Sequence, residues 1–145
     1  MLSFKIWGAL RALPLALACA SLAPSQHPAQ SKLVFSHALP RMDGVNLQAK
    51  AVTVTYPPGG ASPVHSHPCP VIGYVIEGSL KMQVKGEPET IYKVGETFYE
   101  APNGVHAVSA NASPDRPATF IAFFVCDHDT PLSVAAPAGI APKEK

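Results

Sequence analysis

Apolar residues along this chain occur in short segments, either alternating with polar residues or running together. A two-residue period is typical of a strand with one buried face, and a short continuous apolar run is typical of a strand buried on both faces. We therefore predict eight strands, at residues 33–38, 46–56, 71–77, 80–85, 89–93, 96–100, 105–110 and 118–126.

The residues between these segments are mostly Gly, Pro, Asn and Asp. The chain has 16 prolines and 10 glycines, placed mainly between the apolar runs, which leaves little room for long helices. Gly78 and Ser79 separate two predicted strands, and we expect a hairpin there. Short strands at near-regular spacing predict an all-β sandwich or barrel.

The beginning of the chain has the pattern of an export signal. Lys5 and Arg11 precede a short apolar segment at residues 12–23, and small residues offer a cleavage site before Ser21. The segment is shorter than the roughly 20 residues that a membrane-spanning helix needs. We predict a signal peptide at residues 1–20, a flexible linker at residues 21–32, and a periplasmic or secreted mature protein without a membrane span.

The cysteines leave two questions open. Cys19 allows an alternative form of export in which this residue becomes a lipid-anchored N-terminus. Cys69 and Cys126 remain in the mature chain, and an oxidising compartment would let them pair, but the sequence does not set the distance between them. We place the folded domain at residues 33–130 and an extended tail, rich in Ala and Pro, at residues 131–145.

Composition and charge exclude several classes of partner. A chain of 145 residues with 47% hydrophobic residues can form one domain with a single core. Its net charge is +1 and it has no cluster of Lys and Arg, whereas nucleic-acid binding needs a basic patch. We therefore expect a small-molecule substrate or ligand rather than nucleic acid. A homodimer is left open.

Three histidines are placed where they could share one metal ion. His65 and His67 are two residues apart, so in an extended segment they lie on one face, about 7 Å apart along the backbone. His106 occurs in a second segment punctuated by Gly and Pro, and neutral imidazole is a common metal ligand. A single His-x-His in a loop is more often solvated than metal-bound. The third histidine favours a metal site.

The spacing of these residues resembles the two sequence motifs of the cupin superfamily. The matching positions are Gly59, His65, His67 and Gly78 in the first motif, and Gly95 and His106 in the second. Asn103 stands at the usual glycine position of the second motif, and Asn tolerates a left-handed turn better than most residues. The chain is most similar to small single-domain cupins of the quercetin dioxygenase-like type.

This resemblance implies a jelly-roll β-barrel, also called a double-stranded β-helix, with a metal ion in its wide mouth. Val71 stands where the family has a glutamate ligand, so the implied metal site consists of His65, His67 and His106. Glu100 is a candidate additional ligand, although a solvated loop carboxylate is the commoner role for such a residue. The remaining candidates for lining the pocket are Val71, Tyr74, Met82 and Phe98.

Three neutral imidazoles would leave a divalent transition metal with its full charge and with open coordination positions. The sequence does not distinguish Fe, Mn, Ni, Cu and Zn, and it names no catalytic residue. Our leading hypothesis is an exported, mononuclear, dioxygenase-like enzyme that acts on a small oxygenated organic compound. Two alternatives stay open: a non-catalytic cupin that binds a metal or small ligand, and an isomerase or lyase that uses the metal as a Lewis acid.

Overall fold

The computed structural model describes residues 29–136, and the chain divides into two units, Met1–Ser31 and Lys32–Lys145. All strands belong to the second unit, which is described below. The predicted signal peptide, most of the linker and the end of the predicted tail lie outside the described residues. None of the described residues forms a helix that could cross a membrane.

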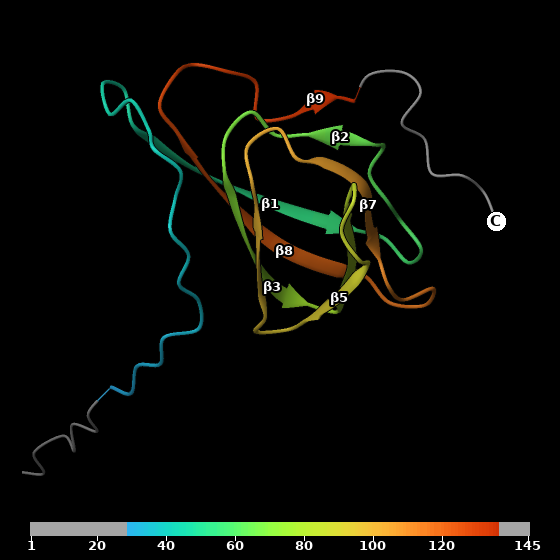
Figure 1. The fold of residues 1–145 in the computed structure, drawn as a ribbon. Coiled ribbons are helices and arrows are strands. Elements are labelled where there is room, and N and C mark those ends of the chain that lie inside the picture. Colours follow the sequence, from blue (N-terminus) through green and yellow to red (C-terminus); the bar gives the residue numbers. More distant parts are fainter. Residues whose placement is uncertain (1–28, 137–145) are drawn as a thin grey trace, which may run out of the picture. The chain divides into compact units, whose positions relative to one another are not determined.

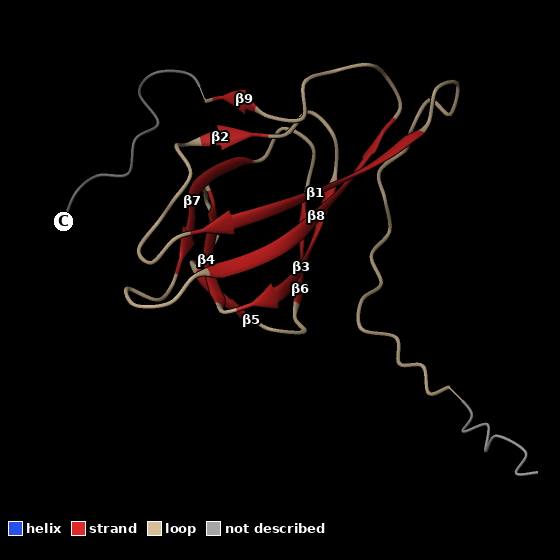
Figure 2. Ribbon diagram, turned by 180° about the vertical axis from the view of Figure 1, so that it is seen from behind, coloured by secondary structure: helices blue, strands red, loops and turns tan. Residues whose placement is uncertain are grey.

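Two antiparallel sheets form the fold (Figure 1), and Figure 2 shows from behind that the described elements are strands joined by loops. The strands are β1 (Gln48–Tyr56), β2 (His65–Ser66), β3 (Val71–Glu77), β4 (Ser79–Val84), β5 (Thr90–Lys93), β6 (Thr97–Glu100), β7 (Val105–Asn111), β8 (Ala118–Cys126) and β9 (Val134–Ala135). One sheet has the order β1-β8-β3-β6 and the other β5-β4-β7-β2-β9. The predicted all-β jelly-roll class is confirmed.

The strand predicted at residues 33–38 is wrong. This segment is extended but belongs to neither sheet. Side-chain contacts attach it to β6 instead: the hydroxyl of Thr97 donates to the carbonyl of Val34 at 3.5 Å, and the ring of His37 stacks on Tyr99 with centroids 3.7 Å apart. This apolar-rich segment is therefore attached by a few contacts to β6 and lacks the backbone ladder of a strand, while Leu33 and Val34 stay 81% and 53% exposed.

The hairpin predicted at Gly78 is also wrong. β3 pairs with β6 and β8, whereas β4 pairs with β5 and β7, so Gly78 forms a corner between the two sheets. Its φ is 68°, and a Cβ there would lie 2.4 Å from the carbonyl oxygen of Pro117. A corner and a hairpin both favour glycine at positive φ, so the local sequence does not separate them.

The core lies between the inward faces of the two sheets. β8 shows the two-residue period that fills it, because its residues 118, 120, 122, 124 and 126 are buried while Phe123 is 43% exposed. Val71 and Val75 of β3, in the same sheet, and Leu80 of β4, in the other sheet, are also fully buried. β3, β4 and β8 therefore present one apolar face to the interior, as their sequence patterns indicate.

A disulfide joins Cys69, in the loop after β2, to Cys126 at the end of β8. The fold brings their Cα atoms within 5.2 Å, which settles the pairing that the sequence left open. Beside it, the backbone N–H of Val125 donates to the carbonyl of Pro70 at 3.2 Å. The segment that carries His67 is therefore attached covalently to the first sheet.

β2 and β9 extend the second sheet beyond β7 (Figure 1). β2 pairs with β7 on one side, which sets His65 opposite His106, and with β9 on the other. Val134 and Ala135 of the predicted tail thus act as an edge strand over the segment that holds the first histidine. The C-terminal part of the described chain is therefore part of the site's support.

Candidate metal centre

The three histidines predicted as ligands lie together. The rings of His65 and His106 have centroids 5.1 Å apart, as expected for residues opposite one another in adjacent strands. The centroid of the His67 ring lies 4.8 Å from that of His65 and 5.3 Å from that of His106. The structure thus brings into one cluster the two histidines of the first motif and the histidine of the second.

Backbone carbonyls hold two of these rings in place. Nδ1 of His65 lies 2.7 Å from the carbonyl oxygen of Pro63, and Nδ1 of His67 lies 2.5 Å from that of Leu132. A ring that donates Nδ1–H to a carbonyl has its Nε2 lone pair free, and this is how metal-binding histidines are commonly oriented. Both rings are therefore prepared to bind a metal through Nε2.

The environment of His65 favours its neutral form. Burial lowers the pKa of His65 below its usual value of 6.5, and the neighbouring imidazoles of His67 and His106 act in the same direction. The contacts with the carbonyl of Pro63 and with Glu100 act in the opposite direction but do not offset the effect of burial. Neutral imidazole is the form that binds metal, so this environment suits a ligand.

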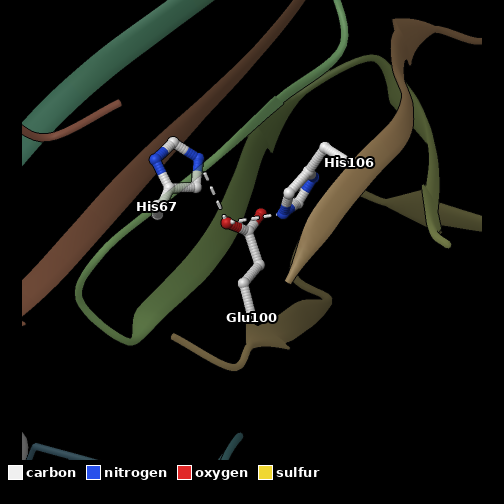
Figure 3. Close-up of side chains that lie close together, drawn as sticks. All are labelled: His67, Glu100 and His106. Carbon is white, nitrogen blue, oxygen red and sulfur yellow. Dashed lines mark ion pairs between the residues drawn. The ribbon is translucent and has the colours of Figure 1, made fainter. Parts of the chain in front are cut away.

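Glu100, the last residue of β6, places its carboxylate between two of the histidines. Figure 3 shows the side chains of His67, Glu100 and His106 pointing toward one another from three segments. Oε2 of Glu100 lies 3.1 Å from Nε2 of His106 and 3.4 Å from Nε2 of His67. Glu100 is only 4% exposed, so the expectation of a solvated loop carboxylate is wrong.

Strand register explains how Glu100 reaches this place. β3 and β6 are antiparallel, and Val71 lies directly opposite Glu100. Residues opposite one another share a face of the sheet, so the Glu100 carboxylate enters the space that a glutamate at position 71 would face. One local feature indicates that Glu100 faces inward: Phe98, two residues earlier, is apolar and is buried on the same face of β6. No local feature predicts the pairing of Glu100 with Val71.

Several buried polar atoms of this cluster have no hydrogen-bond partner among the described residues: Oε2 of Glu100, and Nδ1 and Nε2 of His106. The contacts between Glu100 and the imidazoles are close enough for ion pairs but lack hydrogen-bond geometry. Each buried polar atom left unpaired costs about 1–3 kcal/mol. The ligand atoms of His67, Glu100 and His106 lie within 4.8 Å of one another. This nitrogen and carboxylate set fits a divalent cation.

His65, His67 and Glu100 line a cavity of about 230 Å³. The rest of its wall consists of the apolar side chains of Val52, Val54, Val71, Phe120, Ala122, Phe124 and Leu132, together with Tyr56, Ser62, Ser109 and Ser133. Pockets for drug-sized ligands are larger, about 300–1,000 Å³. The cavity therefore suits a small and mostly apolar molecule.

The other candidate pocket residues are distributed over three places. Val71 lines the cavity of about 230 Å³, while Met82 and Phe98 line a second one of about 40 Å³ that Glu100 and His106 also border. Tyr74 lines neither cavity. It pairs with Thr97 on the outer face of the sheet, because residues three apart in a strand point to opposite faces. Its assignment to the pocket is wrong.

Three residues that line the cavity of about 230 Å³ are not among the predicted site residues: Tyr56, Ser62 and Ser109. Their side chains are hydrogen-bonded to one another although they come from β1, the segment before β2, and β7. Tyrosine and serine are common in strands and turns, so no local signal separates them from ordinary sheet residues.

The loop between β6 and β7 connects Glu100 with His106. Its Asn103 has a φ of 62°, so the left-handed turn expected at this asparagine is confirmed. The N–H of Asn103 donates to the carbonyl of His67 at 2.7 Å. One backbone hydrogen bond thus ties together the segments that hold the first and second motifs.

A family model described as the cupin domain matches residues 52–124, just over half of the 145-residue chain. The matched region contains the three histidines and Glu100. No curated protein has a sequence similar enough to match this chain.

Several solved structures share the fold. The DMSP lyase DddQ of Ruegeria pomeroyi has a TM-score of 0.55 at 24% identity, over 63% of this chain and 45% of the lyase. A mutant oxalate decarboxylase of Bacillus subtilis has a TM-score of 0.52 at 26% identity, over 60% of this chain and 23% of the decarboxylase. The polyketide cyclase RemF of Streptomyces resistomycificus has a TM-score of 0.50 at 20% identity, over 66% of each chain.

The matched part of this chain spans less than half of the lyase and about a quarter of the decarboxylase. The names of the three proteins describe different reactions. These likenesses establish a shared fold, and the chemistry of the site has to be argued from its own residues.

Proposed function

Since this chain belongs to the cupin domain family, we propose that it is an exported metal-dependent enzyme acting on a small oxygenated organic compound. One observation carries the proposal: the buried carboxylate of Glu100 lies between the imidazoles of His67 and His106 with its Oε2 unpaired, and His65 and a small apolar cavity lie beside them. A buried cluster of this kind is costly unless a cation completes it.

The residues that would hold the ion are His65, His67, His106 and Glu100. Two of the imidazoles have Nε2 available because their Nδ1 contacts a carbonyl oxygen. One carboxylate among neutral imidazoles balances half of a divalent charge, so the centre would stay cationic toward substrate. When bound, the metal would polarise a substrate oxygen or, if it is iron or copper, supply one-electron chemistry.

The chain itself would select and shield the substrate. The apolar walls of the cavity, among them Val71, Phe120 and Phe124, would exclude water from the reacting end of the molecule. A cavity of about 230 Å³ favours substrates smaller than drug-sized ligands. This size supports a small carbonyl or hydroxyl compound rather than a bulky polyphenol, even though the sequence motifs resemble the quercetin dioxygenase-like type.

A lyase or isomerase is the second candidate function. Among the solved proteins with this fold are a lyase and a decarboxylase, the latter at 26% identity. In this case the three histidines alone would hold the metal, and Glu100, which lines the substrate cavity, would be free to accept a proton from carbon there. Measurement of O₂ uptake with small diketones, phenols and thiols separates the two: an oxygenase consumes O₂ with product, whereas a lyase forms product under anaerobic conditions. A chain that binds metal but turns over none of these compounds would be a binding protein.

Export is part of the proposal. Disulfides persist in oxidising compartments and are rare in the cytosol of most organisms, so the pairing of Cys69 with Cys126 supports it. Mass spectrometry of protein expressed in a host with an export pathway should find an N-terminus at Ser21, or at Cys19 in the lipid-anchored form. A mature protein that retains Met1 would contradict export.

Metal content tests the centre directly. Purified wild-type protein should contain about one transition metal ion per chain by mass spectrometry of the elements, and His106→Ala should lose most of it because one ligand of a buried centre is gone. His128→Ala is the matched control, since His128 is an exposed histidine that contacts Asp127 and is remote in sequence from the motifs. Circular dichroism should show the same β-sheet signal in both variants. Wild-type metal content in His106→Ala would reject this residue as a ligand.

A further inference from the structure

Three hydroxyl groups from separate segments meet inside the fold, and we name them the hydroxyl cluster: Tyr56, Ser62 and Ser109. Oη of Tyr56 lies 2.6 Å from Oγ of Ser62 and 2.9 Å from Oγ of Ser109. Tyr56 is 7% and Ser109 is 5% exposed, whereas Ser62 is half-buried, so the cluster extends from the interior toward the opening of the fold. Apolar side chains could fill the same space without any need for partners.

The hydroxyl cluster opens into the same cavity as the proposed metal ligands. Tyr56, Ser62 and Ser109 line the cavity of about 230 Å³ that His65, His67 and Glu100 also line. Apart from Ser133, the rest of the wall is apolar. The cavity therefore has polar groups of two kinds, ligand atoms for a metal and neutral hydroxyls.

A β-bulge separates the two polar regions along β7. His106 and Ser109 are three residues apart and would face opposite sides of a regular strand, yet both are buried. The pairing of β4 with β7 shifts register between Gln83 and Val84, because β7 has one extra residue at this point. The bulge turns β7 so that the side chains of His106 and Ser109 both point inward. Three residues at 3.3 Å each place their backbones about 10 Å apart.

The hydroxyl protons can be arranged in two ways. Oγ of Ser109 lies 3.5 Å from Sδ of Met82, a weak acceptor. If Ser109 donates to that sulfur, Tyr56 donates to Ser109 and Ser62 donates to Tyr56, which leaves the Ser62 oxygen as an acceptor. If Ser109 donates to Tyr56 instead, the order reverses and the Ser62 proton becomes available. The cluster can therefore accept a hydrogen bond from a hydroxyl group of a ligand or donate one to its carbonyl group.

Charge limits the ligand further. Among the described residues that line the cavity there is no lysine or arginine, so a second anionic group would find no cationic side chain at the hydroxyl end. A neutral oxygen function fits there, whereas a carboxylate or phosphate would lose hydration without compensation.

From these observations we infer that the hydroxyl cluster is a substrate subsite. The substrate class is a small two-ended molecule with metal-binding oxygens at one end, an apolar body, and a neutral hydroxyl or carbonyl at the other end. This inference rests on the proposed function, because the metal centre would hold the first end. The cluster determines specificity and does not take part in the bond-making chemistry.

Paired hydroxamates test the subsite on the full chain loaded with Zn²⁺, an ion that does not change oxidation state. The probes are benzohydroxamate, 4-hydroxybenzohydroxamate and 4-carboxybenzohydroxamate, whose hydroxamate oxygens can bind the metal while the para group extends toward the hydroxyl cluster. By calorimetry, wild-type protein should bind the 4-hydroxy probe about three- to tenfold more tightly than the unsubstituted one, the effect of one neutral hydrogen bond. The 4-carboxy probe should bind no more tightly than the unsubstituted one.

Tyr56→Phe removes the central hydroxyl and keeps the ring. It should abolish the preference for the 4-hydroxy probe, because Ser62 loses the Tyr56 hydroxyl that orients its own. Zn²⁺ binding should be retained, since Tyr56 is not a proposed ligand. Tyr92→Phe is the matched control: Tyr92 packs against Phe98 and does not line this cavity, so the preference should remain. A purely structural role for Tyr56 would lower thermal stability without changing the ratio of the two affinities.

The outcomes separate the two proposals. Equal affinity of wild-type protein for the hydroxylated and unsubstituted probes, or a preference that survives in Tyr56→Phe, overturns the subsite while bound Zn²⁺ leaves the proposed metal centre standing. Tighter binding of the 4-carboxy probe overturns the inferred neutrality of this end. A wild-type chain that binds no Zn²⁺ overturns the metal centre and, with it, the subsite.

Discussion

The interior of this protein contains two polar regions that differ in how their atoms are paired. In the metal centre, Oε2 of Glu100 and both ring nitrogens of His106 have no hydrogen-bond partner among the described residues. In the hydroxyl cluster, each of Tyr56, Ser62 and Ser109 has a partner within 2.9 Å. Both regions face the same apolar cavity, although His106 borders only the smaller neighbouring one.

This difference indicates that the hydroxyl cluster is stable by itself, whereas the metal centre needs a bound cation. A buried polar group that forms its hydrogen bonds costs little, whereas one left unpaired costs about 1–3 kcal/mol. The hydroxyl cluster can therefore persist in the protein by itself. In the metal centre, a bound cation would offset the free-energy cost of burying unpaired polar atoms. Variants that change one region at a time test this comparison.

The largest effect is expected from removal of the disulfide. Cys69→Ser combined with Cys126→Ser should lower the free energy of unfolding by about 2–4 kcal/mol, because the unfolded chain gains freedom. The affinity for Zn²⁺ should also fall, since the bond anchors the segment that carries His67. Denaturant unfolding and metal titration measure both changes. The relative affinity for the two hydroxamate probes should stay as in wild type, because the hydroxyl cluster lies on other segments.

The second largest effect is expected from moving the carboxylate from Glu100 of β6 to position 71 of β3. Glu100→Val should weaken Zn²⁺ binding about 100-fold, or about 2.7 kcal/mol, because the anionic ligand is lost. In the double variant Glu100→Val with Val71→Glu, the carboxylate returns to the position that the family motif uses, directly opposite its present one. We expect affinity within about tenfold of wild type, since the two positions share a face.

Competition with a fluorescent zinc chelator measures these affinities. Glu77→Gln serves as the control, because Glu77 accepts a hydrogen bond from Thr119 at the far end of β3 and should not affect the metal. If Val71→Glu restores nothing, position 71 does not reach the centre. The motif alignment would then be wrong at that position.

Metal-dependent stability gives a third test. Zn²⁺ at about 100 times its dissociation constant should raise the free energy of unfolding of the wild type by about 2.7 kcal/mol, because the ion binds only the folded chain. The melting temperature should then rise by about 10 °C, because 1 kcal/mol shifts it by about 4 °C in a domain of roughly 100 residues. Without metal, Glu100→Val should be at least as stable as wild type, since it removes an unpaired buried carboxylate. A large loss of stability in metal-free Glu100→Val would show that Glu100 is already satisfied by the protein.

The smallest effect is expected in the hydroxyl cluster. Tyr56→Phe should lower the free energy of unfolding by about 1 kcal/mol, with or without Zn²⁺, because it breaks hydrogen bonds that the protein satisfies internally. Thermal melts with and without metal measure this. A stabilised Tyr56→Phe variant would contradict the view that the hydroxyl cluster is satisfied by the protein itself.

Local sequence determined most of the strands and three of the four proposed ligands. The alternation or continuity of apolar residues located β3 and β8 at their observed bounds, Val71–Glu77 and Ala118–Cys126. The spacing of His65, His67 and His106 identified the cluster, because a histidine pair two residues apart shares a face in any extended segment. These features depend on side-chain direction along a single strand, which the residue order itself sets.

Tertiary structure decided which strands are neighbours, and with them the rest of the site. The register that sets Glu100 against Val71, the approach of Cys69 to Cys126, and the meeting of Tyr56 with Ser109 all join segments far apart in sequence. The two-residue period says which face a side chain occupies, but not which strand lies beside it or whether Gly78 turns a hairpin or a corner. Pairing is chosen by the burial of all the apolar faces at once, and no single segment contains that information.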